Sequence, residues 1–198
     1  EAMKAVDFSK YKEVVFCGFG EPTEALDVLK QSAKLIKEKY NMPIRINTNG
    51  LGSLVNERDI VPELKGLVDT ISVSLNTPNA DEYHRLGRSK FGEKSFDAMI
   101  DFTKECTKYI PNVVMTTVET TITHEEEKQC QEICDRIGAK YRIRQKEGIS
   151  PPFRQDFAQI QSLPATRSAL RQGDIILHGI ISTRSYPHFP QPVNNLFL

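Results

Sequence analysis

The sequence lacks the features that would assign it to several large classes of protein. It has no excess charge, since 26 Lys and Arg residues balance 26 Asp and Glu residues, so its composition does not point to nucleic acid or an acidic membrane. It has no apolar run of about 18 residues, as a membrane-spanning helix requires, and no visible signal peptide. Four irregularly placed cysteines favour reduced thiols in a cytoplasmic protein over a disulfide framework.

Two common phosphate-binding loops are also missing. The stretch FCGFGEPTEAL (16–26) begins like a glycine-rich loop, but Pro22 and Thr23 stand where a dinucleotide-binding GxGxxG motif needs its third glycine. No Walker-type lysine follows this stretch. The two glycines that flank Phe19 therefore indicate a ligand other than those that these phosphate-binding loops take.

Residues 1–146 alternate between strand patterns and helix patterns. Short β-branched and aromatic runs predict strands at 12–19, 42–50, 69–76, 112–121 and 139–145. Helices are predicted between them at 24–40, 57–67, 95–109 and 124–137. Such alternation predicts an α/β fold with parallel strands and right-handed crossovers.

Individual residues predict where these helices begin and end. We expect Thr23 to cap the first helix through its hydroxyl, and Pro62 to make the second one short or bent. Thr123 and Glu126 have the spacing of a capping box, and Gly138 should end the helix that follows them.

The composition changes after Lys146. Residues 147–198 contain no lysine and are richer in Pro, Gln, Arg and Ser, and only 174–182 read as a strand. We therefore predict two units, a barrel domain at 1–146 and a poorly ordered C-terminal appendage at 147–198.

All five predicted strands end in polar residues, mostly small amides and hydroxyls. Ligands of parallel α/β folds bind beyond the carboxyl ends of the strands, so we expect a polar site on this rim, although loops are polar in most proteins. Arg142 and Arg144 flank Ile143 on the last strand, so one face of that strand is charged and both arginines are candidate substrate contacts.

The sharpest signal is the turn formed by Gly18 to Pro22. Glycine permits close approach of backbone to a ligand, Glu21 offers a carboxylate at the strand's end, and Pro22 fixes the exit of the chain. A carboxylate with exposed carbonyls suits an ammonium group better than a phosphate. A tight strand-to-helix turn with a solvated Glu21 is the alternative.

Three stretches, VVFCGFGEPT, RINTNG and DTISVSLN, occur in this order and resemble the radical S-adenosylmethionine (SAM) superfamily. The longer stretches VPELKGLVDTISVSLNTPNADEYHRL and SKFGEKSFDAMIDFTKE are similar to TatD-associated radical SAM proteins. This resemblance covers residues 1–146 and implies a partial (βα)6-type, TIM-like barrel. It also implies that the ammonium group of SAM is bound by Gly18, Gly20, Glu21 and Pro22. Other parts of SAM would be bound by Thr48, Asn49, Ser74 and Asn76.

The chain departs from the family in its cysteines. The family ligates a 4Fe–4S cluster through CxxxCxxC, and no such motif is present, so we expect no metal ligands in this chain. The cluster ligands are expected upstream of residue 1, with the first βα unit of the barrel missing. Cys130 and Cys134 share a predicted helix face with Ile133 and Ile137, which indicates buried core thiols rather than a metal site.

The resemblance implies an iron–sulfur-dependent enzyme that, when intact, cleaves SAM to a 5′-deoxyadenosyl radical acting on an unknown substrate. A cluster-free module that binds SAM or another adenosyl ligand, or an inactive fragment with an open barrel edge, are the alternatives. The resemblance also suggests a functional link to a TatD-type hydrolase.

Overall fold

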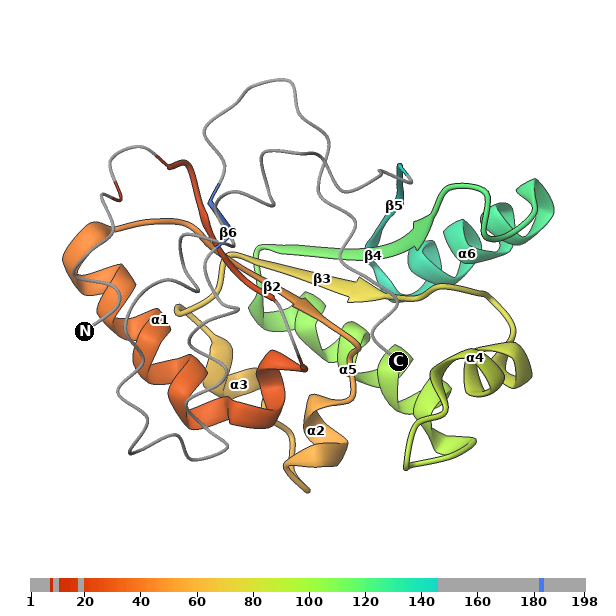
Figure 1. Cartoon of the computed structure of the whole chain (residues 1–198), viewed down its shortest axis with the longest axis horizontal. Coiled ribbons are helices and arrows are strands. Elements are labelled where there is room, and N and C mark those ends of the chain that lie inside the picture. The colour runs from red at the N-terminus through yellow and green to blue at the C-terminus, as the bar shows by residue number, and fades with distance from the viewer. Residues whose placement is uncertain (1–7, 9–10, 18–19, 146–181, 184–198) are drawn as a thin grey trace, which may run out of the picture.

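The computed structural model describes residues 8, 11–17, 20–145 and 182–183, and these form one sheet with its helices (Figure 1). The strand order is β5-β4-β3-β2-β1-β6. β1 to β5 pair in parallel, whereas β6 pairs antiparallel with β1. The strands are β1 (Val14–Phe16), β2 (Ile44–Thr48), β3 (Thr70–Ser74), β4 (Asn112–Val118), β5 (Lys140–Arg144) and β6 (Ser182–Thr183). The sheet is open, and its five parallel strands confirm the predicted partial, TIM-like α/β fold.

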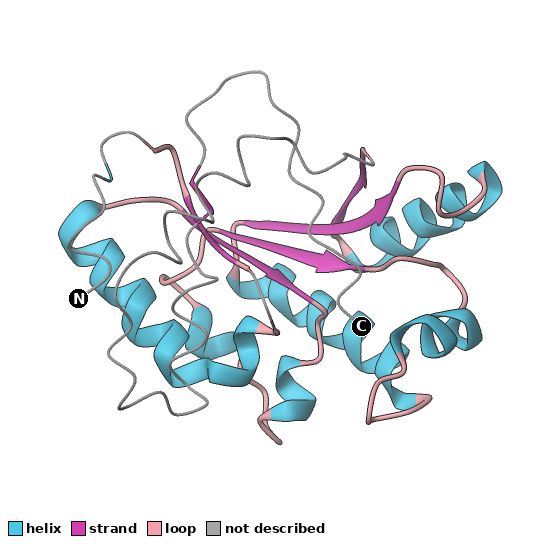
Figure 2. Ribbon diagram, in the orientation of Figure 1, coloured by secondary structure: helices cyan, strands magenta, loops and turns pink. Residues whose placement is uncertain are grey.

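The helices connect the parallel strands and lie along one face of the sheet (Figure 2). They are η3 (Pro22–Ala25), α1 (Leu26–Tyr40), α2 (Gly52–Val55), α3 (Val61–Leu64), α4 (Ala80–Gly87), α5 (Lys94–Tyr109) and α6 (His124–Ile137). The sequence did not predict α4, whose N-cap Asn79 accepts a hydrogen bond from the backbone of Glu82. Pro62 falls in the first turn of α3, where its missing N–H costs nothing, so it agrees with a helix that begins at Val61, and this helix is short, as predicted.

The two faces of the sheet differ in polarity because side chains alternate along each strand. The helix-covered face carries the core, including Phe16, Ile46, Ile71 and Met115, all less than 1% exposed. The opposite face carries Val15 and Val114 but is otherwise largely polar, although parallel sheets usually bury apolar residues on both sides. Its polar residues include Arg45, Asn47, Ser72, Ser74 and Thr116. A polar inner face is therefore the first sign that this side of the sheet holds a ligand.

The ends of α1 and α6 test the capping predictions. Thr123 and Glu126 form the predicted capping box, and Gly138 ends α6 with a left-handed φ of 77°. The prediction for Thr23 was wrong. Glu21 is the N-cap of η3, and the Thr23 hydroxyl donates to the Glu21 carboxylate, which is a stronger acceptor than a hydroxyl.

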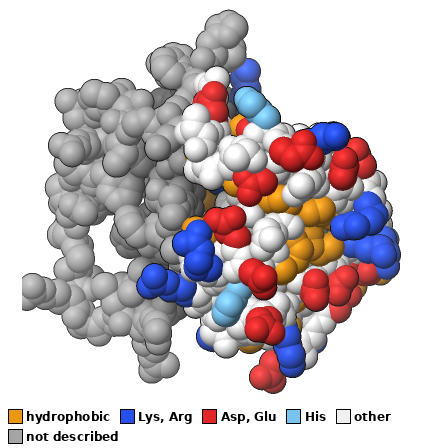
Figure 3. All heavy atoms as spheres, turned by 90° about the vertical axis from the view of Figure 1, so that its right-hand side faces the viewer, with side chains coloured by type: hydrophobic (Ala, Val, Ile, Leu, Met, Phe, Trp, Pro, Cys, Tyr) orange, Lys and Arg blue, Asp and Glu red, His pale blue; other side chains and the backbone are white. Residues whose placement is uncertain are grey.

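The outer surface agrees with the balanced composition. Figure 3, a side view of the molecule, shows acidic and basic side chains interspersed on the described part of that face. None of the described helices is long and apolar enough to cross a membrane.

Some predictions fall outside the described residues. These are the conformation at Gly18, most of the strand predicted at 174–182 and nearly all of the proposed appendage at 147–198. Of that appendage, Ser182 and Thr183 are described, where they form β6.

Candidate functional site

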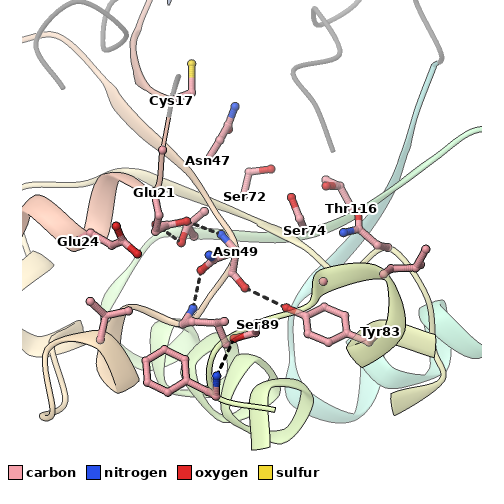
Figure 4. Close-up of a pocket in the computed structure, with 18 of the residues that line it drawn as sticks. Cys17, Glu21, Glu24, Asn47, Asn49, Ser72, Ser74, Tyr83, Ser89 and Thr116 are labelled. Carbon is pink, nitrogen blue, oxygen red and sulfur yellow. Dashed lines mark hydrogen bonds between the residues drawn. The ribbon is translucent and has the colours of Figure 1, made fainter. Parts of the chain in front are cut away.

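A pocket of about 450 Å³ opens at the carboxyl ends of the parallel strands, on the polar face of the sheet (Figure 4). It is lined by residues from the turn after β1, from β2, β3, β4 and β5, and from the loop after α4. The site thus lies where the strand–helix alternation predicts a ligand, at the rim of the sheet.

Eight of the ten residues proposed from the sequence line this pocket. They are Gly20, Glu21, Thr48, Asn49, Ser74, Asn76, Arg142 and Arg144. Pro22 is buried at the start of η3 and does not line the pocket, and Gly18 lies outside the described residues.

The Glu21 carboxylate ties the turn after β1 to the end of β2. Its Oε1 accepts hydrogen bonds from the Thr23 amide at 3.1 Å, the Thr23 hydroxyl at 2.7 Å and the Thr48 hydroxyl at 2.7 Å. Its Oε2 accepts one, from the Asn49 amide at 2.8 Å. Because a carboxylate oxygen has two lone pairs, Oε2 keeps acceptor capacity for a ligand.

These contacts also set the ionisation of Glu21. Burial raises the pKa of the Glu21 carboxyl, while the hydrogen bonds from Asn49, Thr48 and Thr23 oppose that rise. A positively charged ligand at Oε2 would relieve the cost of the partly buried charge. The predicted alternative of a solvated Glu21 does not match this geometry, because the side chain is held by four donated hydrogen bonds.

Gly20 and Gly50 have backbone conformations that favour glycine. Gly20 has a φ of +112°, and a Cβ built there would meet no atom within 4 Å. Space beside exposed backbone is what a ligand needs for close approach. Gly50 has a φ of +78°, and a Cβ there would come within 2.8 Å of Met99 Cγ, so this glycine serves packing.

Asn49 contributes its backbone and its side chain to the turn after β2. Its Oδ1 accepts from the Leu51 amide at 2.9 Å, and its carbonyl accepts from the Tyr83 hydroxyl at 3.4 Å (Figure 4). Burial, with the nearby Glu21 charge, raises the pKa of Tyr83 to about 12, so the hydroxyl stays a donor. Tyr83 is a pocket residue that the sequence analysis missed, since nothing in the sequence brings α4 to this turn.

Small polar side chains form the wall of the pocket between its two charged ends. Asn47, Ser72, Ser74 and Thr116 come from three adjacent strands, and register pairs Asn47 with Ser72 and Ser74 with Thr116. Among the described residues, the buried Asn47 Oδ1 has no hydrogen-bond partner. An unused acceptor facing a pocket is a candidate ligand contact.

A basic group stands at the β5 side of the pocket. Arg142 and Arg144 line it with Arg45 of β2, whose Nη2 lies 2.8 Å from Glu13 Oε1. Burial lowers the pKa of Arg142 and of Arg144, and the neighbouring positive charge of Arg45 or Arg142 lowers it further. The sequence predicted the two arginines of β5, and it missed Arg45 because its charge stands within the apolar strand pattern of β2.

The loop after α4 completes the mouth of the pocket. Arg88, Ser89, Lys90 and Phe91 line it, whereas the basic side chains His84 and Arg85 of α4 do not. Arg88 ends α4 in a left-handed conformation, with a φ of 42°, which turns the chain toward the pocket. Nothing in the sequence distinguishes Arg88 from the nearby basic residues His84 and Arg85.

The four cysteines occupy two kinds of place. Cys106, Cys130 and Cys134 are fully buried in the core, as the sequence predicted for Cys130 and Cys134. Cys17 is half-buried and lines the pocket, and burial raises the pKa of its thiol, a rise that the charge of Arg45 opposes. The described part of the chain contains no group of three or more His, Cys, Asp or Glu side chains that could hold a metal ion.

Comparison with known proteins gives one family and one similar structure. The chain resembles the crystal structure of a radical SAM methyltransferase from Sphaerobacter thermophilus, with 18% identity, a TM-score of 0.44 and coverage of 88% of this chain and 55% of that one. The chain therefore spans little more than half the length of that enzyme. No curated protein matches the chain significantly. The model of the radical SAM superfamily matches residues 1–137, more than two thirds of the sequence, so the chain belongs to the radical SAM superfamily.

Proposed function

We propose that this barrel is the SAM-binding part of an enzyme that cleaves SAM to a 5′-deoxyadenosyl radical and uses that radical on a substrate. Membership of the radical SAM superfamily implies, in general, a role for SAM and a 4Fe–4S cluster. In the finer proposal, the turn at Gly18, Gly20, Glu21 and Pro22 receives the ammonium group of SAM. Thr48, Asn49, Ser74 and Asn76 serve the rest of the cofactor.

The arrangement around Glu21 is the observation that carries this proposal. An ammonium group needs acceptors, and the turn offers the free lone pair of Glu21 Oε2 beside the open backbone of Gly20. Since Glu21 is held by four hydrogen bonds, binding would cost little further ordering of this side chain. The serines of β3 and the unused Asn47 Oδ1 could then meet the hydroxyl and polar groups of the same ligand.

The described residues do not fit a 4Fe–4S cluster. Such clusters take several thiolates, and only Cys17 among the described pocket residues is a cysteine. In this proposal, the pocket residues of the chain bind and orient SAM and the substrate.

Calorimetry with SAM tests the proposal. We expect Glu21→Gln to weaken binding about tenfold, because it removes the charge that the ammonium meets at Oε2. Glu24→Gln is the matched control, since Glu24 also lines the pocket and carries the same charge without the hydrogen bonds of Glu21. Equal affinity of wild type and Glu21→Gln, with both folded, would refute this assignment.

A cluster-free module that binds SAM without cleaving it is the second candidate. It is favoured by the absence of a cluster ligand set among the described residues. Anaerobic reconstitution with iron and sulfide distinguishes the candidates: SAM binding without the brown absorbance of a cluster supports the module for this chain.

We also propose that the protein belongs to the TatD-associated group, that it works with a TatD-type hydrolase, and that it is cytoplasmic. The support is the similarity of residues 61–86 and 89–105 to that group, and the four free cysteines, which fit a reducing compartment. Co-purification of a tagged chain with a TatD-type hydrolase from the source cell tests the partnership.

A further inference from the structure

We propose that Arg142 and Arg144 form an anion site, distinct from the SAM site, that binds a phosphate group of the substrate. This inference rests on the proposed function only in naming the occupant a substrate. The anion site itself is argued from the side chains of β2, β4 and β5.

The two arginines face the same pocket from one strand. They are two residues apart on β5, so they project from the same face about 7 Å apart along the strand. Register places Arg142 beside Thr116 and Arg144 beside Val118, so Arg142 is next to a hydroxyl-bearing wall and Arg144 is nearer the rim. A single group can contact both guanidinium side chains from the pocket.

Their positive charges are not balanced from within the described pocket. Its carboxylates are Glu21 and Glu24, which follow β1, and three strands separate β1 from β5 in the sheet. Glu13 forms an ion pair with Arg45, and its negative charge also acts on Arg142, where it opposes the fall in pKa that burial causes. Arg142 Nε and Arg144 Nε are buried and have no hydrogen-bond partner among the described residues. Buried donors without partners raise the free energy of the folded protein. A ligand that accepts hydrogen bonds from them removes this penalty on binding.

The charge count favours phosphate over a single carboxylate. Arg45, Arg142 and Arg144 carry three positive charges against the one negative charge of Glu13, which leaves a local excess of two positive charges. A phosphate monoester carries about −1.5 to −2 at pH 7 and three acceptor oxygens, and guanidinium groups bind such oxygens in a fork. Lowered pKa values of Arg142 and Arg144, caused by burial and by neighbouring positive charge, agree with an unbalanced site.

The SAM site has the opposite character. Around Glu21 the pocket offers acceptors for a cation, whereas around Arg142 and Arg144 it offers donors for an anion. The pocket therefore has an acidic end on the β1 side and a basic end on the β5 side. A cofactor with an ammonium group and a substrate with a phosphate would be sorted to these two ends.

Calorimetry with inorganic phosphate at low, fixed chloride tests the site. We expect the double variant Arg142→Gln/Arg144→Gln to lose phosphate affinity by roughly tenfold or more, and Arg142→Lys/Arg144→Lys to lose less, since lysine keeps the charge without the fork. The matched control is Lys128→Gln/Arg136→Gln, which removes the same charge from exposed positions on α6. Loss of affinity in this control equal to that in the β5 variant would overturn the proposal, because it would reflect overall charge.

Three further measurements keep the outcome decisive. The melting temperature of the glutamine variant should equal or exceed that of wild type, because it removes two like charges from a partly buried site; a marked fall would make these arginines structural. Malonate binding as tightly as phosphate, with the same dependence on the arginines, would overturn the choice of phosphate.

The affinity of the glutamine variant for SAM should be unchanged. A loss of SAM affinity equal to its loss of phosphate affinity would assign the arginines to the cofactor and overturn the proposal. If wild type binds phosphate through these arginines but does not bind SAM, the proposed function fails and the anion site remains.

Discussion

The hydrogen bond between Glu21 and Thr48 should couple the turn after β1 to the end of β2 energetically. The Thr48 hydroxyl donates to Glu21 Oε1 at 2.7 Å, and Thr48 is 4% exposed. A double-mutant cycle of Glu21→Ala and Thr48→Val measures this bond. Thr48→Val is close to isosteric and also removes the acceptor of the Gly50 amide.

The expected magnitudes follow from the contacts. Glu21→Ala removes the acceptor of four hydrogen bonds, each worth about 1.5–3 kcal/mol for a charged partner. Removal of a partly buried carboxylate offsets part of this loss, so we expect about 3–5 kcal/mol in the free energy of unfolding rather than the full sum. Thr48→Val should cost about 2–3 kcal/mol, and the double variant should cost about 1–2 kcal/mol less than the two together.

Urea unfolding at neutral pH, followed by far-ultraviolet circular dichroism, measures all four states of the cycle. The control cycle pairs Glu21→Ala with Thr103→Val, since the buried Thr103 hydroxyl donates to the Met99 carbonyl and shares no hydrogen-bond partner with Glu21. We expect additivity within about 0.5 kcal/mol there. The same additivity in the Glu21–Thr48 cycle would refute the reasoning, because the carboxylate would then not join the two strands.

Three other results are expected. Gly50→Ala should cost more stability than Gly20→Ala, because its Cβ would meet Met99 Cγ at 2.8 Å whereas the space at Gly20 is open; thermal melts check this, and the reverse order would contradict it. Burial raises the pKa of the Glu21 carboxyl in the folded protein above its ordinary value, so the folded protein binds this proton more tightly than the unfolded chain does, and the stability due to Glu21 falls as pH rises through the folded-state pKa. Urea titrations from about pH 4 to about pH 7 should therefore show a steeper fall for wild type than for Glu21→Gln, and parallel curves would contradict it. Iodoacetamide should modify Cys17 before the fully buried Cys106, Cys130 and Cys134, as peptide mass spectrometry would show; early reaction of Cys130 would mean that the packing of α6 is wrong.

The pattern of strands and helices was largely readable from the sequence because it depends on local chemistry. The capping box at Thr123 and Glu126 and the stop at Gly138 involve residues within a few positions of one another. The prediction at Thr23 failed for the opposite reason. Its hydroxyl is used by Glu21, and Glu21 is in turn fixed by Thr48 and Asn49 from another strand.

The candidate site was predicted in outline for a similar reason. Residues that follow parallel strands meet at one edge of a sheet, so the sequence alone could nominate the ends of β1 to β5. It could not select Tyr83 or Arg88, because their places depend on α4 and on the left-handed turn that ends it.

The sequence by itself determined the α/β alternation, the polar rim and the turn with a carboxylate between glycine and proline. These follow from side-chain periodicity and from the conformations that glycine and proline allow. Only the tertiary structure decided that Glu21 is an anchored side chain with acceptor capacity at Oε2. It also decided that Arg142 and Arg144 face the same pocket with buried Nε atoms that have no hydrogen-bond partner among the described residues. The physical reason is that hydrogen-bond saturation and charge balance depend on which distant strands become neighbours, and strand order is a property of the folded sheet.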